Sequence, residues 1–213
     1  MRARSIAFLV IAGSVAGMAC GGGGNIQNLP LRWSGVNPLP RANPSVTRAL
    51  AASPIALGLR DLRADPTAVG SYQDTGFVVR TTDNVGQYCT DRLGEMLIHA
   101  GAHLEPGAPT TLEAELLEYK VVEGSNFEGT VRVRTTLRRG GGTVWTKVLV
   151  GTSKRWGRTH SPENFNEALS NALAEVTQQL LLDDEFARSL GAPPAAGPIH
   201  HRGSSRSVGS PGG

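Results

Sequence analysis

A strict alternation of apolar and polar side chains over residues 130–138 constrains the fold more than any other feature. Odd positions from Val131 to Leu137 are apolar or Thr, whereas even positions from Arg132 to Arg138 are Arg or Thr. Successive side chains of a strand point to opposite faces, so this segment is predicted to be a strand with one buried face. Glycines 140–142 then favour a hairpin, and residues 143–154 return along the first strand. The sequence therefore predicts antiparallel strands with one solvated face.

Two amphipathic helices accompany this hairpin. Residues 83–100 place an apolar side chain at every fourth position, and residues 161–188 carry a similar stripe after Ser161 and Pro162. The other predicted elements are strands at residues 54–60, 77–79 and 111–122 and a polar loop at residues 65–76. The order β-α-β-β-β-α predicts an α+β fold. We expect a two-layer sandwich with both helices packed on one face of a mostly antiparallel sheet.

The N-terminus has the pattern of an export signal. Arg2 and Arg4 precede a short apolar run, and small residues lead to Cys20. This pattern predicts a signal peptide over residues 1–19, because the apolar run is shorter than the roughly 18 residues that cross a bilayer. A cysteine directly after the cut predicts lipidation of Cys20, and buried acyl CH₂ groups contribute about 0.8 kcal/mol each to membrane binding. Secretion without lipidation is the alternative, since residues 17–19 also fit ordinary signal peptidase.

Composition divides the mature chain into three parts. Residues 20–52 are predicted to be the lipidated cysteine and a Gly/Pro-rich linker, and residues 53–190 the folded α+β domain. Residues 191–213 lack core-forming side chains and are predicted to be a disordered tail. Four of the 21 Lys and Arg residues lie in the signal and the tail, which leaves 17 against 18 acidic residues. A body near neutrality argues against nucleic acid as a partner.

Several short motifs occur in an order similar to one known family. The strand end 59–63 (Leu-Arg-Asp-Leu-Arg) leads to Val69-Gly70, and the first helix closes on Leu97-Ile98-His99-Ala100-Gly101. A hairpin carries Thr146-Lys147, and residues 164–173 precede Asp183. Over roughly residues 54–186 the chain thus resembles the YajG-like family of bacterial envelope lipoproteins. The resemblance implies a periplasmic domain anchored in the outer membrane, without catalytic residues to carry over, and Gly21 after the cysteine is similar to the outer-membrane pattern.

The candidate chemical groups favour structural roles. Cys89 lies in the apolar stripe of the first helix and is expected to be a buried thiol, with a Cys20–Cys89 disulfide as the alternative. His99 and His103 have the spacing of a metal pair, but Gly101 is expected to end the helix between them. The carboxylates 183–185 are expected to be a solvated helix end, and Asp61 and Arg63 an exposed ion pair worth at most about 1 kcal/mol. We expect no metal, no cofactor and no enzymatic activity.

One surface has the chemistry of a binding face. Arg132, Arg134 and Arg138 share the solvated side of their strand, and Lys147 and Trp145 from the next strand are expected to join them. Guanidinium groups in a row suit the phosphates of an anionic lipid or an acidic envelope protein, whereas a merely solvated face is the alternative. The sequence thus predicts a non-catalytic binding or assembly module, held on the outer membrane by acyl chains and facing the periplasm. An accessory lipoprotein of a lipid or lipopolysaccharide transport machine is the second hypothesis.

Overall fold

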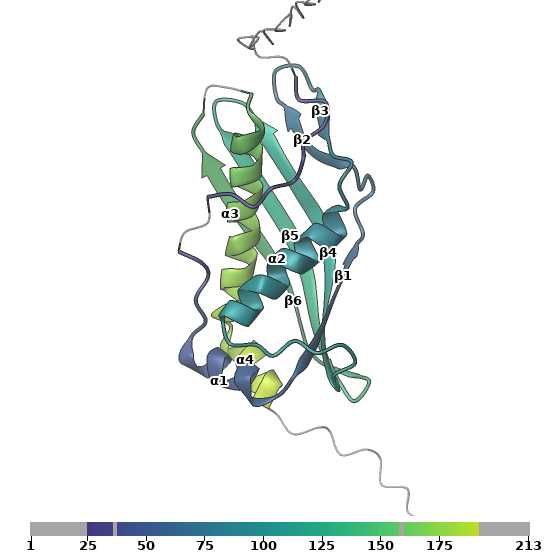
Figure 1. The fold of residues 1–213 in the computed structure, drawn as a ribbon, viewed down its shortest axis with the longest axis vertical. Helices are drawn as coiled ribbons and strands as arrows, with labels where there is room; N and C mark the ends of the chain where they lie inside the picture. The colour runs from purple at the N-terminus through teal and green to yellow at the C-terminus, as the bar shows by residue number, and fades with distance from the viewer. Residues whose placement is uncertain (1–24, 36–37, 158–159, 192–213) are drawn as a thin grey trace, which may run out of the picture.

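The computed structural model describes residues 25–35, 38–157 and 160–191. Its centre is a six-stranded sheet with the path β3-β2-β4-β5-β6, and β1 also pairs with β4 (Figure 1). The long strands are β4 (Thr110–Glu123), β5 (Phe127–Arg139) and β6 (Gly142–Arg155), and the shorter ones are β1 (Ile55–Asp61), β2 (Ala68–Tyr72) and β3 (Val78–Arg80). The predicted signal peptide, Cys20 and the tail beyond Gly191 lie outside the described residues.

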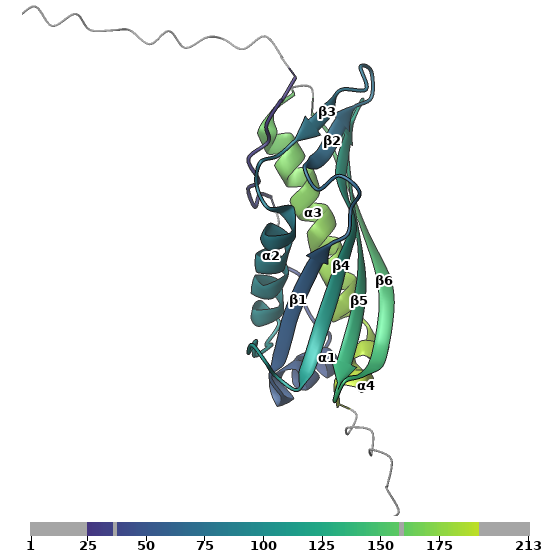
Figure 2. The same cartoon turned by 90° about the vertical axis from the view of Figure 1, so that its right-hand side faces the viewer.

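The predicted α+β architecture is confirmed. Helices α2 (Val85–His99) and α3 (Pro162–Leu181) lie on the same face of the sheet (Figures 1 and 2). The β2–β3, β4–β5 and β5–β6 ladders are antiparallel, whereas β1 and β2 run parallel to β4. Gly140 and Gly141 form the predicted β5–β6 turn, and both adopt positive φ angles, of 56° and 81°, that favour glycine.

Helix α3 approaches the sheet closely because small residues line the contact. A Cβ added to Gly151 would lie within 2 Å of the Ala172 carbonyl oxygen, and one added to Gly129 would lie 2.5 Å from that of Ala168. The predicted stripe of α3 is buried in this contact, and its members are Phe165, Leu169, Leu173, Val176 and Leu180. The stripe of α2 is buried in the same core.

Strand β6 is an edge strand, and α3 covers part of its free edge. The Thr152 N–H donates a hydrogen bond to Glu175 Oε2 at 2.9 Å. Gln179 Nε2 donates to the Val150 carbonyl oxygen at 2.9 Å. Side chains that occupy backbone groups of an edge strand oppose its pairing with another chain.

Three expectations about the elements were wrong. The predicted linker contains helix α1 (Pro44–Ala52), which Asn43 caps and which packs against α4 (Asp184–Gly191). The predicted polar loop contains β2, which inserts beside β4. The single closing helix is two, because Asp183 accepts the N–H of Phe186 at 2.8 Å and starts α4.

Candidate functional site

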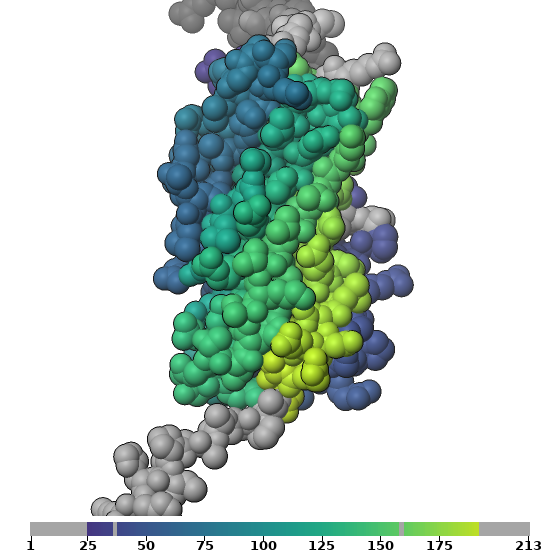
Figure 3. Space-filling view, turned by 180° about the vertical axis from the view of Figure 1, so that it is seen from behind, coloured from purple at the N-terminus to yellow at the C-terminus, as the bar shows by residue number. Residues whose placement is uncertain are grey.

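The three predicted arginines do share the face of β5 that α2 and α3 leave uncovered, the face shown in Figure 3. Each, however, pairs with a glutamate of β4. Arg134 Nη1 lies 2.8 Å from Glu115 Oε2, and Arg138 Nε lies 2.9 Å from Glu113 Oε2. Arg132 Nη2 lies 3.7 Å from Glu118 Oε2. The three arginines are therefore one half of a cross-strand ladder of opposite charges. This pairing favours the alternative of a merely solvated strand face over a free phosphate-binding patch.

The structure does not bring Lys147 and Trp145 to this face. Their register with Thr135 and Leu137 turns both side chains toward the helices. Trp145 is buried, and its ring lies 5.2 Å from that of Phe186. Lys147 Nζ lies 2.7 Å from Asp183 Oδ2. Both residues thus join the sheet to the start of α4.

Asp183 was expected on a solvated helix end, but it is buried, unlike Asp184 and Glu185. Burial alone would raise its pKa. The hydrogen bonds from Lys147 and the Phe186 N–H outweigh that effect and lower the pKa below its usual value. The carboxylate therefore stays charged and holds α4 on β6.

Asp61 and Arg63 form a largely buried pair, contrary to the exposed pair that the sequence predicted. Their side chains are 15% and 6% exposed, and Arg63 Nη2 lies 2.7 Å from Asp61 Oδ2. Arg63 also donates to the carbonyl oxygens of Pro66 and Ala68 and lies over the ring of Tyr119. This guanidinium ties the end of β1 to β2 and β4, which is a structural role.

The remaining candidates do not form a reactive centre. Cys89 is a free, fully buried thiol, and burial raises its pKa well above the usual value. His99 and His103 are exposed on either side of Gly101, whose positive φ ends α2 as expected. No three His, Cys, Asp or Glu side chains gather into a metal-binding group within the described part of the chain.

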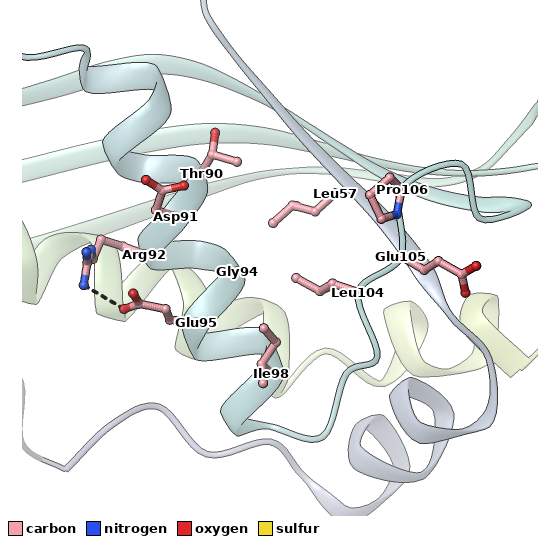
Figure 4. A pocket seen from close by; sticks show the side chains of 10 residues that line it. All are labelled: Leu57, Thr90, Asp91, Arg92, Gly94, Glu95, Ile98, Leu104, Glu105 and Pro106. Atoms are coloured by element: carbon pink, nitrogen blue, oxygen red, sulfur yellow. Dashed lines mark hydrogen bonds and ion pairs between the residues drawn. The ribbon is translucent and has the colours of Figure 1, made fainter.

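Sequence reasoning missed a groove between α2 and the segment that follows it. Leu57 of β1 and Leu104 line its floor, and its volume is about 540 Å³ (Figure 4). Ile98, one of the exposed large apolar residues, stands at its side and is 57% exposed. Ile98 falls outside the four-residue stripe of α2. An apolar residue off the buried stripe is therefore the feature of the sequence that could have indicated this groove.

The described N-terminal end meets the domain beside β2. The Ile26 N–H donates to Tyr72 Oη at 3.0 Å, and the ring of Tyr72 lies 4.4 Å from that of His160. Trp156, which follows β6 at this same end, is 66% exposed. Helix α4 and the last described residue lie at the opposite end (Figures 1 and 2). Among the described helices, none has the length and apolar character to span a membrane.

No protein-family model matches the chain, and no curated protein matches it. A Xanthomonas campestris protein of family DUF330 is 12% identical with a TM-score of 0.49, over 74% of this chain and 92% of its own. A candidate lipoprotein of Caulobacter crescentus is 14% identical with a TM-score of 0.41, over 68% and 95%. The PelC dodecamer of Paraburkholderia phytofirmans is 16% identical with a TM-score of 0.38, over 62% and 88%. At these values the YajG-like resemblance stays a prediction.

Proposed function

We propose that this chain is a lipoprotein of the bacterial envelope, anchored in the outer membrane at Cys20, whose periplasmic domain is a non-catalytic binding module. The observation that carries the proposal is the position of Cys20. It follows the predicted export signal and is separated from the first described residue by only four glycines. Four residues leave little chain between an acylated cysteine and the folded body.

The short tether supports one orientation of the domain. Five residue steps from Cys20 to Asn25 span at most about 17 Å in an extended chain. The end with Ile26, Tyr72 and Trp156 would therefore face the bilayer, and α1 and α4 would face away from it. An exposed tryptophan at the membrane-facing end suits the headgroup region, where indole rings are favoured.

Two features support a binding role without catalysis. Two buried groups with shifted pKa values, Cys89 and Asp183, are held by packing and by structural hydrogen bonds. Neither lines the groove of Figure 4, which has an apolar floor and charged sides. Such a surface can hold a ligand or partner but lacks a nucleophile with an adjacent base.

Fractionation of bacteria that express the full chain tests the anchor. We expect the protein in the outer-membrane fraction, released by detergent but not by high salt, with acyl chains on the N-terminal cysteine in the mass spectrum. A Cys20→Ser variant should lose both properties, and a Gly21→Ser variant is the matched control that should keep them. An unmodified Cys20, with the wild-type chain free in the periplasmic fluid, would refute the proposal.

Cross-linking in intact cells, followed by mass spectrometry, tests the binding role. Envelope proteins that the wild-type domain captures, and that variants with a substituted groove do not capture, would support the binding role. Capture of a lipid-transporter subunit would instead favour an accessory role in a transport machine.

A further inference from the structure

The groove of Figure 4 has an apolar floor at which α2 carries no side chain. The floor consists of Leu57, Leu104 and the bare backbone of Gly94 on α2. A Cβ added to Gly94 would lie 3.5 Å from both Leu57 Cδ2 and Leu104 Cδ1, which is ordinary van der Waals contact. Packing therefore does not require glycine here, although glycine inside a helix costs about 1 kcal/mol relative to alanine. The glycine lets Leu57 and Leu104 lie close to the backbone of α2.

The apolar surface continues out of the groove. Ile98 follows Gly94 by one helical turn and is 57% exposed. A large exposed aliphatic side chain beside an open apolar floor forms a continuous surface that water covers poorly. The volume of about 540 Å³ lies in the range of ligand and side-chain pockets.

The rim of the groove is acidic. Asp91, Glu95 and Glu105 are exposed there, and Arg92 is the one basic residue of the lining, which gives a formal charge of −2. Arg92 is already engaged, because its Nη1 lies 2.7 Å from Glu95 Oε2 and its guanidinium lies over the Tyr88 ring. In Figure 4 the Arg92–Glu95 pair lies on the side of α2 away from Leu57 and Leu104, and the Glu105 carboxylate points outward from the opposite side of the groove. The rim thus presents net negative charge around an apolar floor.

We propose that this groove binds a segment of a partner protein in which Lys or Arg flanks leucine-sized side chains. The apolar side chains would lie over Leu57, Leu104 and Ile98, and the cations would meet the carboxylates of Asp91 and Glu105. Charge complementarity selects against fatty acids and anionic lipids, whose headgroups the rim repels. This inference deepens the proposed binding function and rests on it, but it does not depend on lipidation.

Peptide binding tests the groove directly. The protein is residues 20–213 with Cys20→Ser, which retains every described residue and carries no acyl chain. The probes are two fluorescent 14-residue amphipathic peptides, one of Leu and Lys and one of Leu and Glu, followed by fluorescence anisotropy. We expect the Leu/Lys peptide to bind at least about tenfold more tightly, and we expect 0.5 M salt to reduce that difference through screening.

Matched variants locate the site. Gly94→Leu should fill the floor and weaken binding of the Leu/Lys peptide about tenfold, whereas Gly94→Ala should have a smaller effect. Glu105→Lys should weaken binding, and Glu185→Lys, the same charge change on exposed α4, should not. Circular dichroism melts show whether each variant is folded.

Three results would overturn the proposal: equal affinity for the two peptides, equal effects of Glu105→Lys and Glu185→Lys, or preferential binding of the fatty-acid probe cis-parinaric acid. Because the protein tested is not acylated, such a failure would leave the anchor proposal intact. A failure of the fractionation experiment would likewise leave the groove proposal intact.

Discussion

At the scale of single residues, Asp183 makes the stability of the fold depend on pH. Its pKa in the folded state lies below the ordinary value of 3.8, so folding favours the carboxylate. The stabilisation is complete above about pH 4 and is lost as the pH falls through the lowered pKa. Asn caps a helix about as well as Asp, so Asp183→Asn removes the charge and keeps the cap.

We therefore expect Asp183→Asn to lower the free energy of unfolding by about 1–3 kcal/mol at pH 7. The difference from wild type should shrink at pH 3, when measured by urea denaturation at both pH values. Glu185→Gln, at an exposed position two residues further along, is the control. A difference that is equal at the two pH values would show that the charge of Asp183 does not stabilise the fold.

Arg63 provides a second prediction, because its charge is buried. Removing one partner of a buried pair leaves the other uncompensated, so Arg63→Ala should destabilise the protein by about 3–5 kcal/mol. Arg63→Lys should not restore stability. A single ammonium group cannot donate at once to the Asp61 carboxylate and to the carbonyl oxygens of Pro66 and Ala68, as the planar guanidinium does. Arg60→Ala is the control: Arg60 is 71% exposed, and its pair with Glu115 should contribute less than about 1 kcal/mol. Equal losses in chemical denaturation would contradict this account.

At the scale of elements, the long periodic segments could be predicted from the sequence. Helices α2 and α3 and strand β5 repeat their pattern over enough residues to identify both the element and its buried face. Strands β4 and β6 were recognised as strands, but Trp145 and Lys147 of β6 were assigned to the wrong face. Strand β2 has only five residues, Ala-Val-Gly-Ser-Tyr, and its pairing with β4 is decided by tertiary contact. Because β2 was missed, Arg63 was placed at an open strand end, although β2 covers it.

The same limit explains the errors about the candidate site. The alternation of β5 revealed which face its arginines occupy, but the glutamates that neutralise them stand on β4, and one strand alone does not define its register with another. The one-residue shift between β5 and β6 at Leu137/Arg138 is equally invisible in the sequence. The groove depends on Leu57, Gly94 and Leu104, which three separate segments supply.

The contact between α3 and the sheet leads to a prediction about glycine. Gly151→Ala would place a methyl group against the Ala172 carbonyl oxygen and force the helix away from β6. We expect a loss of at least about 1–3 kcal/mol in the free energy of unfolding. Gly58→Ala is the matched control in β1, because no atom lies within 4 Å of its added Cβ, and it should leave stability unchanged or raise it. Similar thermal melts of the two variants would contradict the close packing.

At the scale of the whole molecule, the folded body is larger than residues 53–190. Leu29, Val46 and Leu50, all within the predicted linker, are fully buried in the common core. The Asn43 N–H also donates to the Leu181 carbonyl oxygen at 3.0 Å, which joins the N-terminal segment to the end of α3. Each buried aliphatic side chain contributes about 1.5–3 kcal/mol, so a chain of residues 53–190 should lose most of a typical domain's stability. Residues 25–191 should unfold cooperatively on heating. Equal melting temperatures for the chains of residues 25–191 and 53–190 would show that the folded domain does not need residues 25–52.

The orientation of the anchored domain leads to a prediction about tryptophan fluorescence. If the end with Ile26 faces the bilayer, Trp156 reaches the headgroup region, whereas buried Trp145 lies far from it beside α4. In vesicles of brominated phospholipid, which quench nearby indoles, the acylated wild-type chain should lose part of its tryptophan fluorescence. In a Trp33→Phe background, which leaves two tryptophans, Trp156→Phe should abolish that loss, whereas Trp145→Phe should preserve it. Six additional glycines after Gly24 would extend the reach by about 20 Å and should weaken the quenching. Quenching that persists in Trp156→Phe would place another face of the molecule against the membrane.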